Sequence, residues 1–122
     1  MDLVSRKHED VTLIESSWWD VISDDVMSQV FDVVEYPGIE LEHAGILETS
    51  LTMYFKPELV HMDRFVEDGV DGTLPYAIYP ASKCQVTETG LLTTARSSSE
   101  AKGKLLADDI TAAYLSIIDK VF

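Results

Sequence analysis

Three glutamates and one histidine gather around a glycine in the segment ELEHAGILETS, residues 40–50. Glu40 and Glu42 precede His43, and Glu48 follows it. An imidazole carries protons near neutral pH, and a neighbouring carboxylate can orient it or act as a general acid or base. Because carboxylates repel one another, grouping them requires a helix terminus, a metal ion or a reaction that stabilises them. This segment is therefore the first candidate for a functional site.

The direction of these side chains depends on where the following helix begins. If the helix began at His43, Glu48 would lie roughly 140° around the axis from it and would face away. If Gly45 caps the helix and Ile46 begins it, Glu48 falls in the first turn, beside free N–H groups and the positive end of the dipole. We adopt the second geometry, which places His43 on the turn, where it can face a cleft. A structural role for Glu48 and a surface role for His43 remain open.

The same segment is a poor metal site. Glu42 and His43 are adjacent, so their side chains diverge, and no second histidine follows at helical spacing. His61 lacks acidic company of this kind and is expected to be a surface residue. We therefore expect no metal ligands in this set and only weak binding of Zn²⁺, Mn²⁺ or Fe²⁺ by the chain alone.

The elements that must position this segment are one strand and three helices. Residues 11–14 predict a buried strand, and residues 23–35 predict a helix with an acidic first turn. A second helix begins after Gly45 and is stopped by Pro57. A third, long helix follows a capping box from Ser97 to Glu100. Residues 2–9 resemble the end of another helix, residues 60–80 predict loops, and residues 90–95 predict a brief extended piece.

Two tryptophans in succession, Trp18 and Trp19, end the predicted strand. Because side chains alternate along a strand, the two indoles should face opposite sides. We assign Trp18 to the interior or a subunit contact and Trp19 to a pocket, with packing of both as the alternative.

The composition limits which partners and which cellular location are expected for the chain. The chain has 122 residues and a net charge of −13, which argues against nucleic acid or an anionic membrane surface as a partner. The lone Cys84 cannot form an internal disulfide, and no hydrophobic signal segment begins the chain, so a cytoplasmic location is expected.

Residues 43–60, HAGILETSLTMYFKPELV, resemble the HAG–ETS–PELV stretch of the creatininase (creatinine amidohydrolase) family. The resemblance spans nearly all of residues 11–122. It implies an α/β fold with three α/β/α layers, a hexamer-type assembly, a divalent metal (Zn, Mn or Fe) and hydrolysis of a small cyclic amide or formamide.

The resemblance also implies roles for single residues. His43 matches the histidine that passes a proton to the leaving nitrogen, and Glu42 matches the acid just before it. Trp19 matches a tryptophan on a mobile segment that closes over substrate. Ile39 and Glu40 stand where creatinine-specific members carry a tryptophan and an aspartate, so the substrate is expected to differ from creatinine itself.

The resemblance covers only the C-terminal half of that family. Its metal ligands lie in N-terminal segments that have no counterpart here. Residues 1–122 are therefore expected to form a single partial domain, inactive without a complementary N-terminal half or subunit that holds the metal. The chain could be a cleaved fragment, a split subunit or a truncated gene product. The alternative function is a non-catalytic assembly or regulatory piece derived from this fold.

Overall fold

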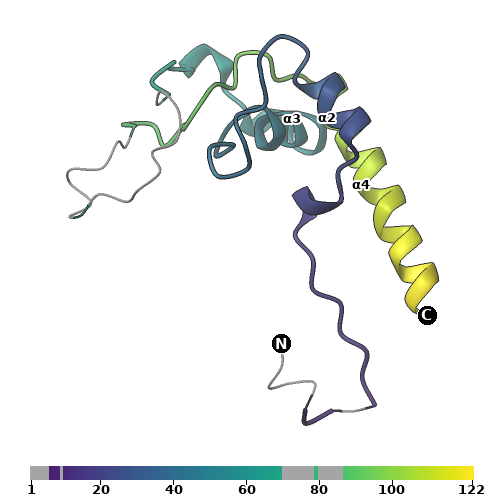
Figure 1. The fold of residues 1–122 in the computed structure, drawn as a ribbon. Coiled ribbons are helices and arrows are strands. Elements are labelled where there is room, and N and C mark those ends of the chain that lie inside the picture. Colours follow the sequence, from purple (N-terminus) through teal and green to yellow (C-terminus); the bar gives the residue numbers. More distant parts are fainter. Residues whose placement is uncertain (1–5, 9, 70–78, 80–86) are drawn as a thin grey trace.

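Three α-helices organise the part of the chain that the computed structural model describes, residues 6–8, 10–69, 79 and 87–122. Figure 1 shows α2 (Asp24–Val30), α3 (Ile46–Phe55) and α4 (Glu100–Val121). Three short 3-10 helices accompany them: η1 (Trp18–Val21), η2 (Pro57–Leu59) and η3 (Met62–Arg64). The core lies where the three α-helices meet, and its buried residues are Val26, Val30, Ile46, Leu47 and Leu106.

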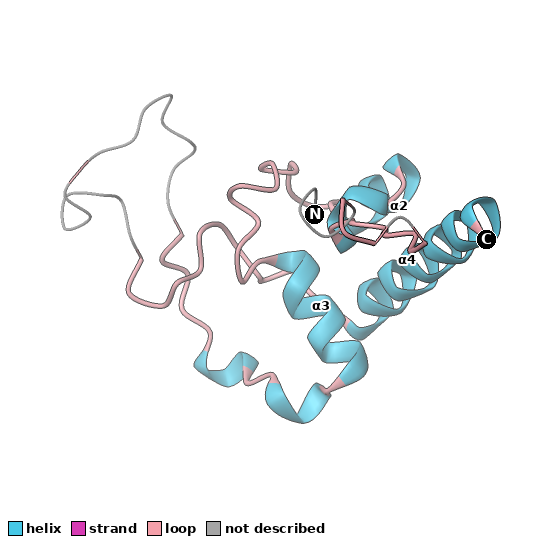
Figure 2. Cartoon of the chain, turned by 90° about the horizontal axis from the view of Figure 1, so that it is seen from below, coloured by secondary structure: helices cyan, strands magenta, loops and turns pink. Residues whose placement is uncertain are grey.

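The closest helix crossing joins α3 to the first turns of α4, as Figure 2 also shows. Gly103 of α4 is buried against the backbone of Ser50, and a Cβ at Gly103 would overlap the Ser50 carbonyl. The Ser50 side chain is fully buried, and its Oγ accepts a hydrogen bond from the N–H of Ser99 at 3.2 Å. Small residues therefore let the two helices approach at the point where α4 begins.

Polar contacts fix α2 against α4. Ser23 is the N-cap of α2, and its side chain accepts a hydrogen bond from the N–H of Val26. The N–H of Ser23 donates to Asp109 Oδ2 at 2.8 Å, and its hydroxyl donates to Asp109 Oδ1 at 3.1 Å. Beyond the other end of α2, Lys102 forms an ion pair with Asp32 at 2.6 Å. These contacts set how α2 lies across α4.

The predicted strand at residues 11–14 is wrong. No strand occurs in the described residues, and residues 11–17 are an irregular, exposed segment. Val11, Leu13 and Ile14 are 47%, 40% and 43% exposed, whereas we expected them to be buried. A strand is stabilised by a hydrogen-bonded neighbour, and no other described segment lies beside this one as a pairing partner. The brief extended piece predicted at residues 90–95 forms no strand either; it consists of bends and irregular backbone, with Leu91 and Ala95 buried.

Two helix boundaries also differ from the prediction. Helix α2 ends at Val30, not at residue 35, because the backbone leaves helical geometry at Phe31. The N-cap of α4 is Ser99, not Ser97, and Ser99 Oγ accepts the N–H of Lys102 at 3.2 Å. Of the helix end predicted over residues 2–9, only residues 6–8 are described, and they contain a turn and no helix. Of the loop predicted over residues 60–80, residues 60–69 are described and contain only η3, whereas residues 70–78, residue 80 and Cys84 lie outside the described residues.

The second half of α4 leaves apolar side chains uncovered. Figure 1 shows it extending away from the other helices. Four large apolar residues at this end are exposed by 44–80%: Leu115, Ile118, Val121 and Phe122. None of the helices described here is long and apolar enough to span a membrane. The uncovered surface is therefore available to another protein segment.

Candidate functional site at the HAG turn

The turn at residues 38–45, which we call the HAG turn, leads into α3. It begins at Gly38, whose φ of +91° lies in the left-handed region that glycine adopts readily, and whose carbonyl accepts the N–H of Leu41 at 3.1 Å. It ends at Gly45, the N-cap of α3, and Ile46 is the first helical residue. The structure thus confirms the predicted helix start, and with it the place of Glu48 in the first turn.

Glu42 lies underneath this turn. Its side chain is 5% exposed, and its Oε1 accepts the N–H of Leu47 at 2.6 Å. Gly45 makes room for it, because a Cβ there would lie 2.5 Å from Glu42 Oε2. That second oxygen is buried and has no hydrogen-bond partner among the described residues. Glu42 therefore caps the first turn of α3 with one oxygen and leaves the other without a partner.

Burial raises the pKa of Glu42 from 4.5 to about 7. This net rise already includes the hydrogen bond from Leu47, which lowers the pKa, and the negative charge of Glu48, which raises it. A carboxyl group with a pKa near neutrality can hold or release a proton under physiological conditions. Glu42 is thus a structural cap whose pKa lies near neutrality, and its catalytic role stays a prediction.

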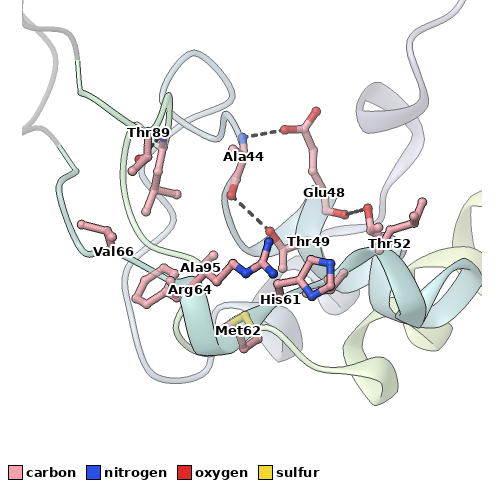
Figure 3. A pocket seen from close by; sticks show the side chains of 14 residues that line it. Ala44, Glu48, Thr49, Thr52, His61, Met62, Arg64, Val66, Thr89 and Ala95 are labelled. Atoms are coloured by element: carbon pink, nitrogen blue, oxygen red, sulfur yellow. Dashed lines mark hydrogen bonds between the residues drawn. The ribbon is translucent and has the colours of Figure 1, made fainter.

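Glu48 holds the turn from above. Its Oε2 accepts the N–H of Ala44 at 2.6 Å, and Thr49 Oγ1 donates to the Ala44 carbonyl at 3.1 Å (Figure 3). Ala44 needs this support, because its φ of +55° is unfavourable for a residue with a Cβ. The structural role that the sequence left open for Glu48 is therefore present in the structure.

His43 lies on the turn, outside the helix, and its side chain is exposed. Its backbone carbonyl accepts the N–H of Leu92 at 3.2 Å, which ties the turn to the segment before α4. Ile39 and Glu40, one turn earlier, are exposed as well. The structure thus leaves the His43 side chain accessible, and its role in proton transfer remains a prediction.

A pocket of about 540 Å³ lies on one side of the HAG turn (Figure 3). Ala44 and Glu48 line it from the turn and the first turn of α3. Neither His43 nor Glu42 lines it, so the pocket does not join all the predicted site residues. Its opposite wall carries His61 and Arg64 around η3. We predicted that His61 is a surface residue, and it is exposed, but it also lines this pocket. The sequence signal that could have placed it there was its position between PELV and MDR.

The two tryptophans lie in η1 and not at the end of a strand. Their rings meet edge to face at 5.4 Å, so they do not face opposite sides as predicted. A 3-10 helix advances about 120° per residue, which allows consecutive side chains to touch. Trp18 packs against the core, as expected of the inner indole, and Trp19 is 41% exposed. The covering role of Trp19 stays a prediction.

The described residues do not fit a metal site by themselves. No group of three or more histidine, cysteine, aspartate or glutamate side chains lies close enough within them to hold an ion. Glu42 is buried and bonded to Leu47, Glu48 is bonded to Ala44, and His43 is exposed beyond both. The three carry acid–base groups on one turn without converging on a single point.

Comparison with known proteins gives consistent results. The sequence model of the creatininase family, described as creatinine amidohydrolase, matches residues 3–118. Creatinine amidohydrolase of Pseudomonas putida is 30% identical over 100 residues, which are 82% of this chain and 38% of that protein. A manganese form of creatininase and a mutant creatininase complexed with creatine each match with a TM-score of 0.85 and 28% identity. Both matches cover 99% of this chain and 49% of the other. The chain thus spans about half the length of the solved creatininases and 38% of the length of the Pseudomonas putida protein.

Proposed function

Because the chain belongs to the creatininase family, we propose that it forms part of a metal-dependent amidohydrolase that cleaves a C–N bond of a small cyclic amide or formamide. The observation that carries this proposal is the geometry of the HAG turn. It leaves the His43 side chain exposed, next in the chain to the buried Glu42 and just before a helix whose start is held by Glu42 and Glu48. An exposed imidazole on a rigid turn is suited to donate a proton to a leaving nitrogen.

In this proposal Glu42 supports the turn that presents His43. Its bond to Leu47 fixes the start of α3, and its raised pKa allows it to exchange a proton near pH 7. Glu48 holds Ala44, the residue after His43, in its left-handed conformation. A positioned acid contributes about 10²- to 10⁴-fold to a hydrolysis rate, and the contribution depends on a fixed geometry.

The proposed metal is zinc, manganese or iron, held mainly by residues outside those that the structure describes. Solved creatininases of similar fold include a manganese form and a zinc form. Since the described residues do not fit a metal site, the chain is proposed to contribute the C-terminal half of the fold and a complementary half to contribute the ligands. The chain is expected to be inactive without it.

The proposed substrate is a small amide that differs from creatinine. Ile39 and Trp19 would contact it, and both side chains are exposed, Ile39 on the HAG turn and Trp19 in η1. An aliphatic side chain at position 39 favours a less planar substrate than an indole would, because it offers no flat surface for stacking. The proposed setting is a cytoplasmic oligomer.

A non-catalytic assembly piece is the second candidate. The observation in its favour is the uncovered apolar surface of α4, together with the lack of a metal-donor group in the described part. Both candidates predict a partner, so binding alone does not separate them. Metal-dependent turnover in the complex does.

The test replaces His43 by Asn in the complex of this chain with a complementary half that carries the metal ligands. Loss of a positioned acid predicts a turnover lower by about 10²-fold or more with unchanged metal content. His8→Asn is the matched control, since His8 is also exposed but lies outside the HAG turn and the pocket beside it. Turnover of the His43 variant equal to that of the control would refute the proton-transfer role, and a wild-type complex without turnover would favour the assembly piece.

A further inference from the structure

The pocket beside the HAG turn has an apolar body and a polar rim. Six large apolar side chains line it: Leu59, Val60, Met62, Phe65, Val66 and Leu91. The rim carries His61 and Arg64 on one side and the hydroxyls of Thr49 and Thr52 on the other. A volume of about 540 Å³ is in the range of small-molecule sites. None of the roles proposed for His43, Glu42 or Trp19 uses this pocket.

Arg64 is the only lysine or arginine among the residues that line this pocket. The chain has 9 Lys and Arg residues against 22 Asp and Glu residues, so a cation has many possible partners. Three other cations take one: Arg96 pairs with Glu67, Lys102 with Asp32, and Lys104 with Asp108. The guanidinium of Arg64 has no ion pair or hydrogen bond within the described residues, although it lines the pocket.

The nearest acidic group of the lining does not serve Arg64. Figure 3 shows the Glu48 carboxylate directed toward Ala44, whose N–H it accepts at 2.6 Å. His61 lies on the same side as Arg64, because side chains three residues apart eclipse in a 3-10 helix. The backbone N–H of Arg64 donates to the His61 carbonyl at 2.9 Å within η3. The rim therefore offers a planar cation and an imidazole together, with an apolar wall behind them.

We propose that this pocket binds a small molecule made of a carboxylate and an apolar body. Arg64 receives the carboxylate through its paired N–H groups, with His61 beside it, and the apolar body lies against Phe65 and its neighbours. The site is distinct from the exposed His43 and does not rest on the amidohydrolase proposal. Its ligand is recognised by charge and shape, with no chemical step.

The test is a titration of the full, isotopically labelled chain with 3-phenylpropionate, followed by NMR. Saturable shifts of amides in residues 59–66 and 89–95 are expected. The uncharged analogue 3-phenylpropanol should produce no saturable shifts at the same concentrations. Arg64→Gln should raise the Kd about tenfold, as for loss of a charged hydrogen-bond donor, and Arg64→Lys should restore only part of the affinity.

Arg96→Gln is the matched control, because it removes one positive charge near Phe65 from outside the pocket lining. The Kd of the Arg96 variant should stay within about twofold of wild type, because solvent screens a charge outside the pocket. An equal loss of affinity in the Arg64 and Arg96 variants would show that binding depends only on net charge, and it would overturn the proposal. Equal binding of the alcohol, or shifts that never saturate, would overturn it as well.

Discussion

Gly103 of α4 and Ser50 of α3 meet backbone to backbone, with no space for a side chain at position 103. A Cβ there would overlap the Ser50 carbonyl and lie 2.8 Å from the Cβ of Tyr54. The start of α4 is thereby fixed against the helix that carries Glu48. The geometry of the HAG turn thus depends on a contact one and a half turns further along α3.

Gly103→Ala tests this crossing by the sign of its effect. Helix propensity alone predicts that Ala stabilises the protein by about 1 kcal/mol. The contact with Ser50 predicts the opposite, a loss of about 1–3 kcal/mol in the free energy of unfolding, because a carbonyl cannot move aside like a flexible side chain. Urea unfolding of both proteins measures the difference. Ser116→Ala, at an exposed position of α4, is the control and should change little; a more stable Gly103 variant would contradict the crossing.

Glu42 predicts an unusual dependence of stability on pH. Its folded pKa of about 7 lies above its ordinary value of 4.5, so between these values the folded state binds more protons than the unfolded state. Its contribution to stability is therefore fully present below pH 4.5 and is lost as the pH rises to about 7. The variant Glu42→Gln does not titrate and keeps an acceptor for Leu47.

The measurement is the free energy of unfolding of both proteins from pH 4 to pH 8. The difference between Glu42→Gln and wild type should grow in favour of the variant from pH 4.5 to about 7 and then level off. Asp32 and Asp68, whose pKa values are lowered by hydrogen bonds from Lys102 and Thr89, titrate alike in both proteins and cancel. Parallel profiles would show that Glu42 ionises normally.

Asp109 predicts a specific loss of stability. It accepts two hydrogen bonds from Ser23, the N-cap of α2, so Asp109→Ala leaves that cap without its partner. We expect a loss of about 1–3 kcal/mol in the free energy of unfolding. Asp108→Ala removes the same charge from the next residue, where it breaks only an exposed pair with Lys104, and should cost less than about 0.5 kcal/mol. Equal losses would reduce the effect to net charge.

Trp18 and Trp19 predict opposite outcomes on truncation. Trp18 packs against the core, so Trp18→Ala should lower the free energy of unfolding by about 3 kcal/mol or more. Trp19 is 41% exposed, so Trp19→Ala should leave folding and metal content intact and raise KM or lower turnover in the complemented enzyme. The measurements are urea unfolding and steady-state kinetics. A Trp19 variant that unfolds while the Trp18 variant loses only activity would reverse the assignment.

The sequence predicted local structure where a single residue decides it. Gly45 and Pro57 bound α3 as expected, because a helix start needs free N–H groups and a proline cannot continue a helix. The family resemblance could be seen in the sequence because the HAG–ETS–PELV pattern is long and ordered, and the match of the family model confirmed it.

The sequence failed where structure depends on distant partners. The apolar run Val11–Ile14 has the composition of a strand, but pairing requires a neighbour that composition does not reveal. The place of Arg64 in the pocket lining could not be predicted for a similar reason, because residues of η3 and α3 come together only in the folded chain. The burial of Glu42 beneath Gly45 also depends on the shape of the turn and not on spacing along the chain.

The exposed segment at residues 11–17 has a consequence for the chain in solution. Its apolar side chains Val11, Leu13 and Ile14 are exposed and can associate with apolar surface on another copy of the chain. The net charge of −13 keeps copies of the chain apart only while electrostatic repulsion reaches between them. Raising the ionic strength from 0.01 M to 0.15 M shortens the Debye length from about 30 Å to about 8 Å. Self-association of the chain on its own is therefore expected to be weaker in dilute buffer than in physiological buffer.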